Sequence, residues 1–400
     1  MTLPSPPVLQ ALKKSAASMA NRNTPFVHNE WYVAAFASEV TRELLPRILL
    51  DKRVVLFRSE SGEPVALSDR CAHRAYPLSL GRLEGDTLVC GYHGFRFDTA
   101  GNCIEVPSAA KCPKEVGVAR YPVLQRGPLV WIWMGDPQLA DPGRLPEQEW
   151  LGDSGWETSS GYFELQSNYV SMHENLLDLT HLSYLHAATF GTPDYARAPF
   201  RSEIADGYFA LHRDVVPTTL PPVWAEPTGL AGCDTAARIV KSEFKSPAFH
   251  QVNVSFYDSK LPESRRKVSR IKTAHILTPR THSSCHYFIV HGRDFALNDD
   301  GVTQFMHENL FAAFKEDVEG MAALEQVWET TDPQDMYEIS VASDGPSVAM
   351  RRYLKARADA EAAQRLAAQA AGEARVAPPP PRAQQAAQAG QALGRPEQVA

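Results

Sequence analysis

The chain contains two short motifs, Cys71-Ala72-His73 and Cys90-Gly91-Tyr92-His93, which are separated by sixteen residues. Each motif places a cysteine within three residues of a histidine, where a short strand candidate gives way to a loop. Thiolates and imidazoles bind soft and borderline transition metals. In a chain of 400 residues with only six cysteines, the repeated pair favours a metal centre over a disulfide framework.

Two cysteines and two histidines also form the ligand set of a mixed-ligand iron–sulfur cluster. In a Rieske [2Fe–2S] centre, two histidines replace two cysteines on one iron, which raises the reduction potential relative to an all-cysteine cluster. The motifs therefore predict a one-electron relay. We assign no role to the remaining cysteines, because a free cysteine usually acts as a small buried hydrophobe: Cys103, Cys112, Cys233 and Cys285.

Composition indicates a globular protein of two or three domains, since 44% of the residues are apolar and 22% are charged. The 40 basic and 47 acidic residues give no electrostatic footprint for nucleic acid, so we expect small-molecule or protein partners. No apolar run approaches the roughly 18 residues of a membrane helix, and the first residues lack a secretory signal. We expect a cytoplasmic protein without a membrane anchor.

The N-terminal part of the chain has the pattern of a small all-β domain, which we place at residues 28–140. Its strand candidates are bounded by Gly, Pro, Asp and Asn and lie at 53–57, 65–68, 87–90, 95–98 and 129–134. Residues 1–27 are rich in Pro, Ser and Ala, so we expect a flexible extension, with ordered structure beginning near Trp31. The prolines within 136–153 predict a linker.

Residues 155–355 have the texture of an α+β domain. A helical segment near 168–182 precedes four strand candidates, at 237–244, 251–257, 270–278 and 284–292. A long helix is predicted at 303–329, and another from Asp344 to about residue 373. Residues 356–400 comprise the end of that helix and a tail rich in Ala, Pro and Gln, which we expect to be disordered. The predicted fold class is α+β.

The segment 175–186 contains a second group of metal-binding residue types, Asp178, His181 and His186. Asp178 and His181 share a helix face, but His181 and His186 are about 140° apart around an ideal helix. Both imidazoles can face one ion only if the helix ends or bulges between them, as happens at some functional sites. The alternative is a solvated polar face opposite a buried stripe of Met172, Leu176 and Leu179.

Helix 303–329 places Asp317 where its apolar stripe needs a hydrophobic residue; the stripe consists of Leu310, Phe314, Met321, Leu324 and Trp328. A buried unpaired charge is costly, so Asp317 must be paired, protonated or bound to a cation. One explanation is a salt bridge to Arg or Lys. The other is that Asp317 joins His181 and His186 in the two-histidine, one-carboxylate triad of non-haem Fe(II) oxygenases, which leaves positions open for oxygen.

Taken together, these residues resemble the Rieske non-haem iron oxygenases, in the α-subunit-only branch of vanillate and dicamba O-demethylases and phthalate-type dioxygenases. The resemblance covers roughly residues 28–355 and also rests on the segments 29–35, 273–279, 285–288 and 315–317. It implies an N-terminal Rieske domain and a helix-grip-like antiparallel catalytic sheet with helices. Tyr76 and Tyr92 occupy the positions of the extra disulfide cysteines of respiratory Rieske proteins, and Phe95 replaces a Trp of some relatives.

The resemblance also implies the cofactors and the role of each ligand. One [2Fe–2S] cluster would be held by Cys71 and Cys90 on one iron and by His73 and His93 on the other; a mononuclear Fe(II) would be held by His181, His186 and Asp317. Asp178 would be the electron-transfer bridge, because in the family it hydrogen-bonds an iron-ligand histidine of its own chain and a Rieske histidine of the neighbouring chain. That arrangement implies a ring-shaped homotrimer.

By this resemblance the chain is the terminal oxygenase of a multicomponent system. It would use O2 and electrons from a separate reductase, with or without a ferredoxin domain, to hydroxylate, dioxygenate or O-demethylate a small aromatic substrate, carboxylated or an aryl ether. No GxGxxG follows a strand, so NAD(P)H would act only through the reductase. Two alternatives are a steroid or other alicyclic substrate, and a Rieske electron carrier without oxygen chemistry.

Strands 237–292 are expected to line the substrate pocket. Candidate substrate contacts are Gln251 and His275, which match contact positions of the dicamba-type branch, and Asn175. The alternative for Gln251 and His275 is an ordinary position on a solvated strand face. Cations that could pair with a substrate carboxylate are Arg238, Lys241 and Arg293, although basic residues on strands are more often solvated.

Overall fold

The structure is a computed structural model that describes residues 4–112, 115–332 and 334–376, with side chains placed to residue 368. It consists of a large unit that ends at Glu361 and a small unit from Ala362 onward, of which the end of helix α5 (Gly345–Val376) is described. The tail predicted to be disordered lies outside the described residues from 377 on. Within the described ranges, no helix combines the length and apolar character needed to span a bilayer.

The N-terminal part of the large unit consists of three small antiparallel sheets. The first has the order β1 (Trp31–Phe36), β11 (Leu129–Trp133), β10 (Val123–Arg126); the second has β2 (Leu45–Leu49), β3 (Lys52–Arg58), β4 (Pro64–Ser68), β9 (Arg120–Tyr121). The third has β5 (Arg82–Glu84), β6 (Thr87–Val89), β7 (Arg96–Phe97), β8 (Cys103–Glu105). The strands predicted for this region are all present.

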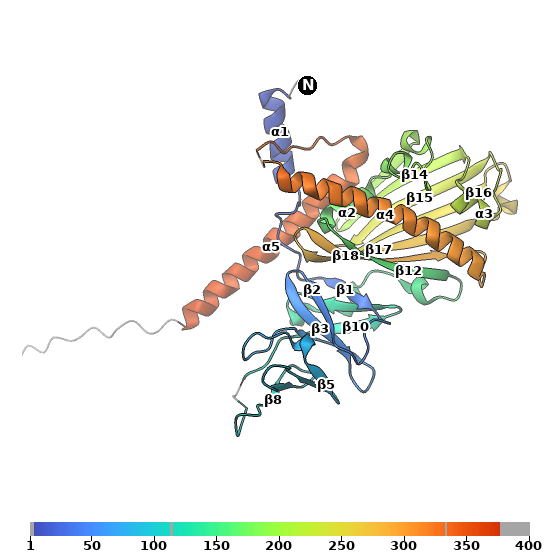
Figure 1. Ribbon diagram of the computed structural model, residues 1–400. Coiled ribbons are helices and arrows are strands. Elements are labelled where there is room, and N and C mark those ends of the chain that lie inside the picture. The colour runs from blue at the N-terminus through green and yellow to red at the C-terminus, as the bar shows by residue number, and fades with distance from the viewer. Residues whose placement is uncertain (1–3, 113–114, 333, 377–400) are drawn as a thin grey trace, which may run out of the picture. The chain divides into compact units, whose positions relative to one another are not determined.

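The C-terminal part is built on one seven-stranded antiparallel sheet. Its strand order is β12 (Glu157–Leu165), β18 (Ser284–Arg293), β17 (Ser269–Thr281), β16 (Phe249–Asp258), β15 (Ala236–Ser246), β14 (Tyr208–Thr218), β13 (Phe200–Ala205). The helices are α2 (Tyr169–Leu177), α3 (Pro222–Thr228) and α4 (Asp300–Thr330). Figure 1 shows the long helix α4, in orange, running along this sheet. The predicted α+β class is confirmed, whereas β12, β13 and β14 were not predicted.

Close packing between α4 and the sheet depends on a glycine. A Cβ atom at Gly161, in the middle of β12, would lie 2.1 Å from the Phe311 ring of α4, far inside van der Waals contact. Along the buried side of α4, the expected stripe is present at Leu310, Phe314 and Met321, and Asp317 lies within it. Leu324 is exposed, so the stripe is narrower than predicted near the end of the helix.

Two helices differ from the expectation. Helix α1 (Pro6–Ala17) precedes Trp31, where we expected no ordered structure; two prolines begin it, and Ala, Leu and Lys favour its continuation. Helix α2 ends at Leu177 rather than near residue 182, because Asp178 adopts an extended conformation and its carboxylate accepts a hydrogen bond from the Thr180 amide. The buried Leu179 prolongs the apolar pattern beyond the helix itself.

Candidate metal centres and substrate pocket

The two Cys/His motifs fold into loops of the same design. The first loop follows β4, and the second joins β6 to β7. In each loop the cysteine carbonyl accepts a hydrogen bond from the amide four residues later: from Ala75 to Cys71 at 3.0 Å, and from Gly94 to Cys90 at 3.1 Å. Both donor residues have positive φ, +56° at Ala75 and +73° at Gly94. The repeated turn therefore presents a cysteine and a histidine from each loop in a similar way.

The four side chains of these loops form two pairs. The thiols of Cys71 and Cys90 are buried in a small apolar core, and burial together with the neighbouring Cys90 thiol raises the pKa of Cys71. The imidazoles of His73 and His93 are exposed, with ring centroids 4.6 Å apart, and His73 stacks on Phe95 at 4.7 Å. A two-iron cluster with both cysteines on one iron and both histidines on the other fits this division, and its histidine side would face the surface.

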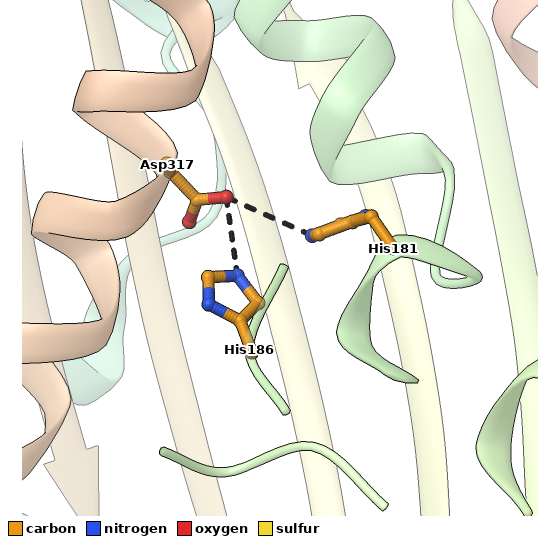
Figure 2. Close-up of side chains that lie close together, drawn as sticks. All are labelled: His181, His186 and Asp317. Carbon is orange, nitrogen blue, oxygen red and sulfur yellow. Dashed lines mark hydrogen bonds and ion pairs between the residues drawn. The ribbon is translucent and has the colours of Figure 1, made fainter. Parts of the chain in front are cut away.

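A second group of donor atoms brings together residues that are far apart in the sequence. Asp317 lies on α4, whereas His181 begins the short 3-10 helix η5 (His181–Ser183) and His186 follows it (Figure 2). Asp317 Oδ1 lies 3.1 Å from His186 Nε2 and 3.7 Å from His181 Nε2. All three ligand atoms lie within 4.8 Å of one another, which is a suitable separation for binding one metal ion.

The chain turns sharply between the two histidines, which removes the difficulty posed by their spacing. Helix α2 has already ended, and the Leu185 amide donates to the His181 carbonyl at 2.8 Å, closing a tight turn. The His186 carbonyl then accepts a hydrogen bond from the Gly191 amide at 2.9 Å. A Cβ at Gly191 would lie 1.7 Å from the Leu182 carbonyl oxygen, so this return of the chain requires glycine.

Further hydrogen bonds orient the ligand candidates. Glu316 Oε2 lies 2.7 Å from His186 Nδ1 and also accepts from the Thr189 hydroxyl at 2.8 Å. The Asn175 side-chain amide donates to Asp317 Oδ1 at 2.9 Å. Because Glu316 engages Nδ1, the other nitrogen of His186 is directed toward Asp317, as in carboxylate–histidine–metal arrangements. Sequence reasoning did not assign Glu316, although its position next to Asp317 could have suggested it.

The charge states of Asp317 and His181 suit a metal cation. Asp317 is only 3% exposed, and its ion-pair partners among the described residues are His181 and His186, so of the two explanations for its burial the histidine pairing is found and the salt bridge to Arg or Lys is not. Burial tends to raise the pKa of Asp317, but the hydrogen bond and charge interaction with His186 lower it overall. Burial lowers the pKa of His181. An ionised carboxylate and a neutral imidazole are the metal-binding forms of these groups.

Asp178 is a second carboxylate close to His181. Its side chain is partly exposed, and its Oδ2 is 3.9 Å from His181 Nδ1, beyond hydrogen-bond distance. The His181 Nδ1 atom is buried and has no hydrogen-bond partner in the described part of the chain. Asp178 is thus the carboxylate available to orient His181, while part of its side chain faces outward.

A pocket adjoins the three candidate ligands and encloses about 570 Å³, including its opening to solvent. Strands β15, β16 and β17 contribute Val240, Val252, Thr273 and His275 to its lining, as expected for strands 237–292. The remaining wall is largely apolar, from Leu176, Leu179, Leu182, Phe190, Trp224, Leu310 and Phe314. A mostly apolar cavity with a few polar groups is typical of a small-molecule site.

Both parts of the chain match known protein families. Residues 30–122 match the Rieske [2Fe-2S] domain, and residues 165–360 match the vanillate O-demethylase oxygenase C-terminal domain. Over 346 residues the chain is 33% identical to the oxygenase component of dicamba O-demethylase from Stenotrophomonas maltophilia, covering 84% of this chain and 99% of that protein. This chain belongs to the Rieske non-haem iron oxygenases. The predicted branch, that of the vanillate and dicamba O-demethylases, is confirmed.

Other relatives of this Rieske oxygenase agree. It is 33% identical to the iron-sulfur subunit of a toluene-4-sulfonate monooxygenase system from Comamonas testosteroni, over 79% of this chain and 92% of that protein. A crystal structure of dicamba monooxygenase with 3,6-dichlorosalicylic acid superposes with a TM-score of 0.80 at 31% identity, covering 85% and 99% of the two chains. The protein is an oxygenase component that uses a Rieske cluster, non-haem iron and a separate reductase, so we do not retain the electron-carrier alternative.

In the structure of the oxygenase, one of the three expected substrate contacts belongs to the described lining of the pocket. Gln251 is absent from the described lining of the pocket, because alternate residues of β16 face opposite sides of the sheet and Val252 faces the pocket. Gln251 instead accepts from Trp150 Nε1 at 3.2 Å and donates to Asn253 at 2.7 Å. Asn175 binds Asp317 rather than lining the pocket. His275 does line it.

The three basic residues considered as carboxylate partners also lie in different places in the structure. Lys241 pairs with Glu243 at 2.9 Å on the sheet face opposite the pocket. Arg293 is buried, and its Nη2 donates to the Ala296 and Asp299 carbonyls in the loop before α4. Arg238 lines the pocket. Of these three cations, Arg238 is therefore the one placed to meet a substrate.

Proposed function

We propose that this oxygenase holds its cofactors with the residues described above. Cys71 and Cys90 would bind one cluster iron, His73 and His93 the other; His181, His186 and Asp317 would bind the mononuclear iron. The observation that carries the second assignment is a buried carboxylate whose ion-pair partners are two histidines. When bound, the mononuclear iron supplies the chemistry of O2 activation. The chain supplies the ligands, their orientation through Glu316 and Asn175, and an apolar pocket.

We propose a small aromatic substrate, carboxylated or an aryl ether, bound in the pocket beside these ligands. Aromatic rings of Phe190, Trp224 and Phe314 line that pocket, and the relatives are named for vanillate, dicamba and toluene-4-sulfonate, which are aromatic compounds. Burial lowers the pKa of His275 to about 4, so its imidazole is neutral, and its Nδ1 lies 2.5 Å from the Tyr287 hydroxyl. We propose that the other ring nitrogen donates a hydrogen bond to the substrate.

Asp178 is proposed as the electron-transfer bridge of a head-to-tail homotrimer. Large apolar side chains are exposed beside both partners of such a contact: Tyr92, next to His93, is 60% exposed, and Tyr184, in the turn after His181, is 75% exposed. A heterologous contact that closes into a ring would cover both surfaces at once. The mass of the particle in solution tests this assembly: we expect three chains, and Tyr184→Asp should yield the monomer. A monomeric unaltered protein would contradict the trimer.

The proposed organisation extends to the domain boundaries and the compartment. We propose a Rieske domain at 28–140 and a catalytic domain at 155–355, a division supported by the two family matches, which lie within or close to these bounds. All six cysteines are free thiols. Free thiols and cluster ligands persist in reducing compartments, and this supports a cytoplasmic location.

The metal assignment is tested by iron analysis. We expect about three iron atoms per chain, two in the cluster and one mononuclear. Asp317→Ala should remove the mononuclear iron and leave the visible absorption of the cluster unchanged, whereas Cys90→Ala should abolish that absorption. Oxygenation is then tested with a reductase, isotopically labelled O2 and a panel of aryl ethers and aromatic acids. Full iron content in Asp317→Ala would contradict the assignment.

A further inference from the structure

A buried arginine forms part of the wall of the pocket. Arg238 lies on β15, is 3% exposed, and lines the same cavity as His181, His186 and Asp317. Most of the surrounding wall is apolar, so the guanidinium is a permanent positive charge in a mostly apolar environment. A buried charge is costly unless it is paired and hydrogen-bonded. The neighbours of Arg238 therefore show whether the protein itself compensates that charge.

The described neighbours compensate the charge only in part. Nη1 donates to the Phe190 carbonyl at 2.9 Å, and the guanidinium lies 4.7 Å from the centre of the Tyr195 ring. Nε is buried without a hydrogen-bond partner, and within the described ranges no carboxylate forms an ion pair with Arg238. Asp194 has a charge interaction with Arg238 that tends to raise the pKa of the guanidinium, but the two side chains do not form a salt bridge. The cation thus has donors and charge left for an anion.

A second buried arginine shows what a structural role looks like in the same region. Arg213 lies on the neighbouring strand β14, is as buried as Arg238, and does not belong to the described pocket lining. It donates three hydrogen bonds, to the carbonyls of Tyr195 and Ala196 and to the Thr180 hydroxyl. Nε lacks a hydrogen-bond partner in both arginines, so the difference lies in the terminal nitrogens: the chain binds Arg213 at both of them, whereas the hydrogen bond of Arg238 is made by Nη1.

The position of Arg238 suits a ligand that also reaches the metal-binding end of the pocket. Phe190 lies beside both: its ring centroid is 4.5 Å from the His186 ring and 6.0 Å from the Arg238 guanidinium. Trp224 lies 5.9 Å from the same guanidinium and completes an aromatic wall. A flat ring that packs against this wall would direct one end toward Arg238 and the other toward His186.

We propose that Arg238 binds an anionic group of the substrate, a carboxylate or sulfonate carried on an aromatic ring. The planar guanidinium matches the geometry of such oxyanions and, in a mostly apolar pocket, the attraction between the two charges is screened less than in water. The inference rests on the proposed function in one respect, that this pocket is the substrate site. It makes Arg238 a specificity-determining residue, which selects arene acids over neutral arenes of the same shape.

The test uses three ligands of similar size: 4-methylbenzoate, 4-methylbenzenesulfonate and the uncharged 4-methylbenzamide. Their Kd values are measured by titration calorimetry on the iron-loaded protein without O2, so that binding is separated from turnover. We expect the unaltered protein to prefer the anions. Arg238→Met should weaken anion binding about 10- to 100-fold and change amide binding little, because a charged hydrogen-bonded pair is lost. Arg238→Lys, which keeps the charge without the planar fork, should lose less.

Arg213→Lys is the matched control, since it alters an equally buried arginine outside the pocket lining. We expect lower thermal stability from this control and an unchanged preference for anions. The inference is overturned if the unaltered protein binds no anion or binds the amide equally well, or if both Arg238 variants keep the full preference. Anions that bind through Arg238 but are never oxygenated by the loaded enzyme would instead refute the proposed function and leave the Arg238 assignment intact.

Discussion

Glu316 provides a sharp test of the proposed iron site, because it is not a proposed ligand and does not belong to the described lining of the pocket. Its carboxylate oxygen lies 2.7 Å from His186 Nδ1 and 2.8 Å from the Thr189 hydroxyl. In Glu316→Ala both contacts are lost, and the His186 ring loses the acceptor that directs Nε2 toward Asp317. The ring would then be free to rotate or to change tautomer, so the affinity for Fe(II) should fall.

The size of the effect follows from these contacts. Loss of an outer carboxylate that orients a ligand histidine typically lowers metal affinity 10- to 100-fold, which corresponds to about 1.4 to 2.7 kcal/mol. The Glu316 side chain is 27% exposed, so water can replace part of the lost contact. We therefore expect a decrease near the lower end, about 10- to 30-fold. Glu316→Gln keeps an acceptor oxygen without the charge, so its Fe(II) affinity should lie between that of the unaltered protein and that of Glu316→Ala.

The assay is an anaerobic Fe(II) titration of protein that retains its cluster but lacks mononuclear iron. Glu319→Ala is the control, because Glu319 lies one turn further along α4, is exposed, and pairs with Lys315 at 3.6 Å. Thermal unfolding of both variants shows whether α4 itself is disturbed. Equal Fe(II) affinity in Glu316→Ala and Glu319→Ala would refute the reasoning.

Three further predictions concern other parts of the molecule. Asp178→Ala should keep cluster and mononuclear iron but stop electron transfer between them in single-turnover experiments; normal turnover would contradict the bridge. Gly161→Ala should destabilise the protein by about 1–3 kcal/mol in thermal unfolding, because the new methyl group meets the Phe311 ring, and the same substitution should cost little when it is made in a Phe311→Ala variant, from which the clashing ring is absent. Burial lowers the pKa of His291 to about 3, so the unfolded chain takes up a proton there before the folded one. The free energy of unfolding should therefore fall as the pH drops below about 6.5, by about 1.4 kcal/mol per pH unit from this residue. When that free energy is measured by urea unfolding at several pH values, it should depend less steeply on pH in His291→Gln.

The strands of the catalytic sheet were predictable where apolar and β-branched residues recur between turn residues, as in β15 to β18. Strand β12 was missed because its middle, Thr158 to Gly161, contains polar residues and glycine. The reason is tertiary: Gly161 makes room for Phe311 of α4, and no local pattern contains that contact. The end of α2 was missed for the opposite reason, because Leu179 remains buried after the helix has ended.

In the candidate site, Asp317 could be found from the sequence because a carboxylate interrupts an apolar helical stripe. The pairing of His181 with His186 could not be decided, since it depends on the turn closed between them. Gln251 does not belong to the described lining of the pocket, because side chains alternate across a strand and its neighbour Val252 faces the cavity. Arg238 required the structure, since only burial and the identity of its neighbours separate it from a solvated strand residue.

The end of α2 explains how one short segment can serve both the ligands and the proposed bridge. Glu174 is held by Arg351 of α5 at 3.0 Å, and the next residue, Asn175, donates to Asp317 of α4 at 2.9 Å. One turn later, Asp178 ends the helix and faces His181. Because these contacts fall within a single turn, any movement of α2 would shift Asp178 and the Asp317 contact together. Helix α2 therefore fixes the position of the proposed bridge residue Asp178 relative to the proposed iron ligands.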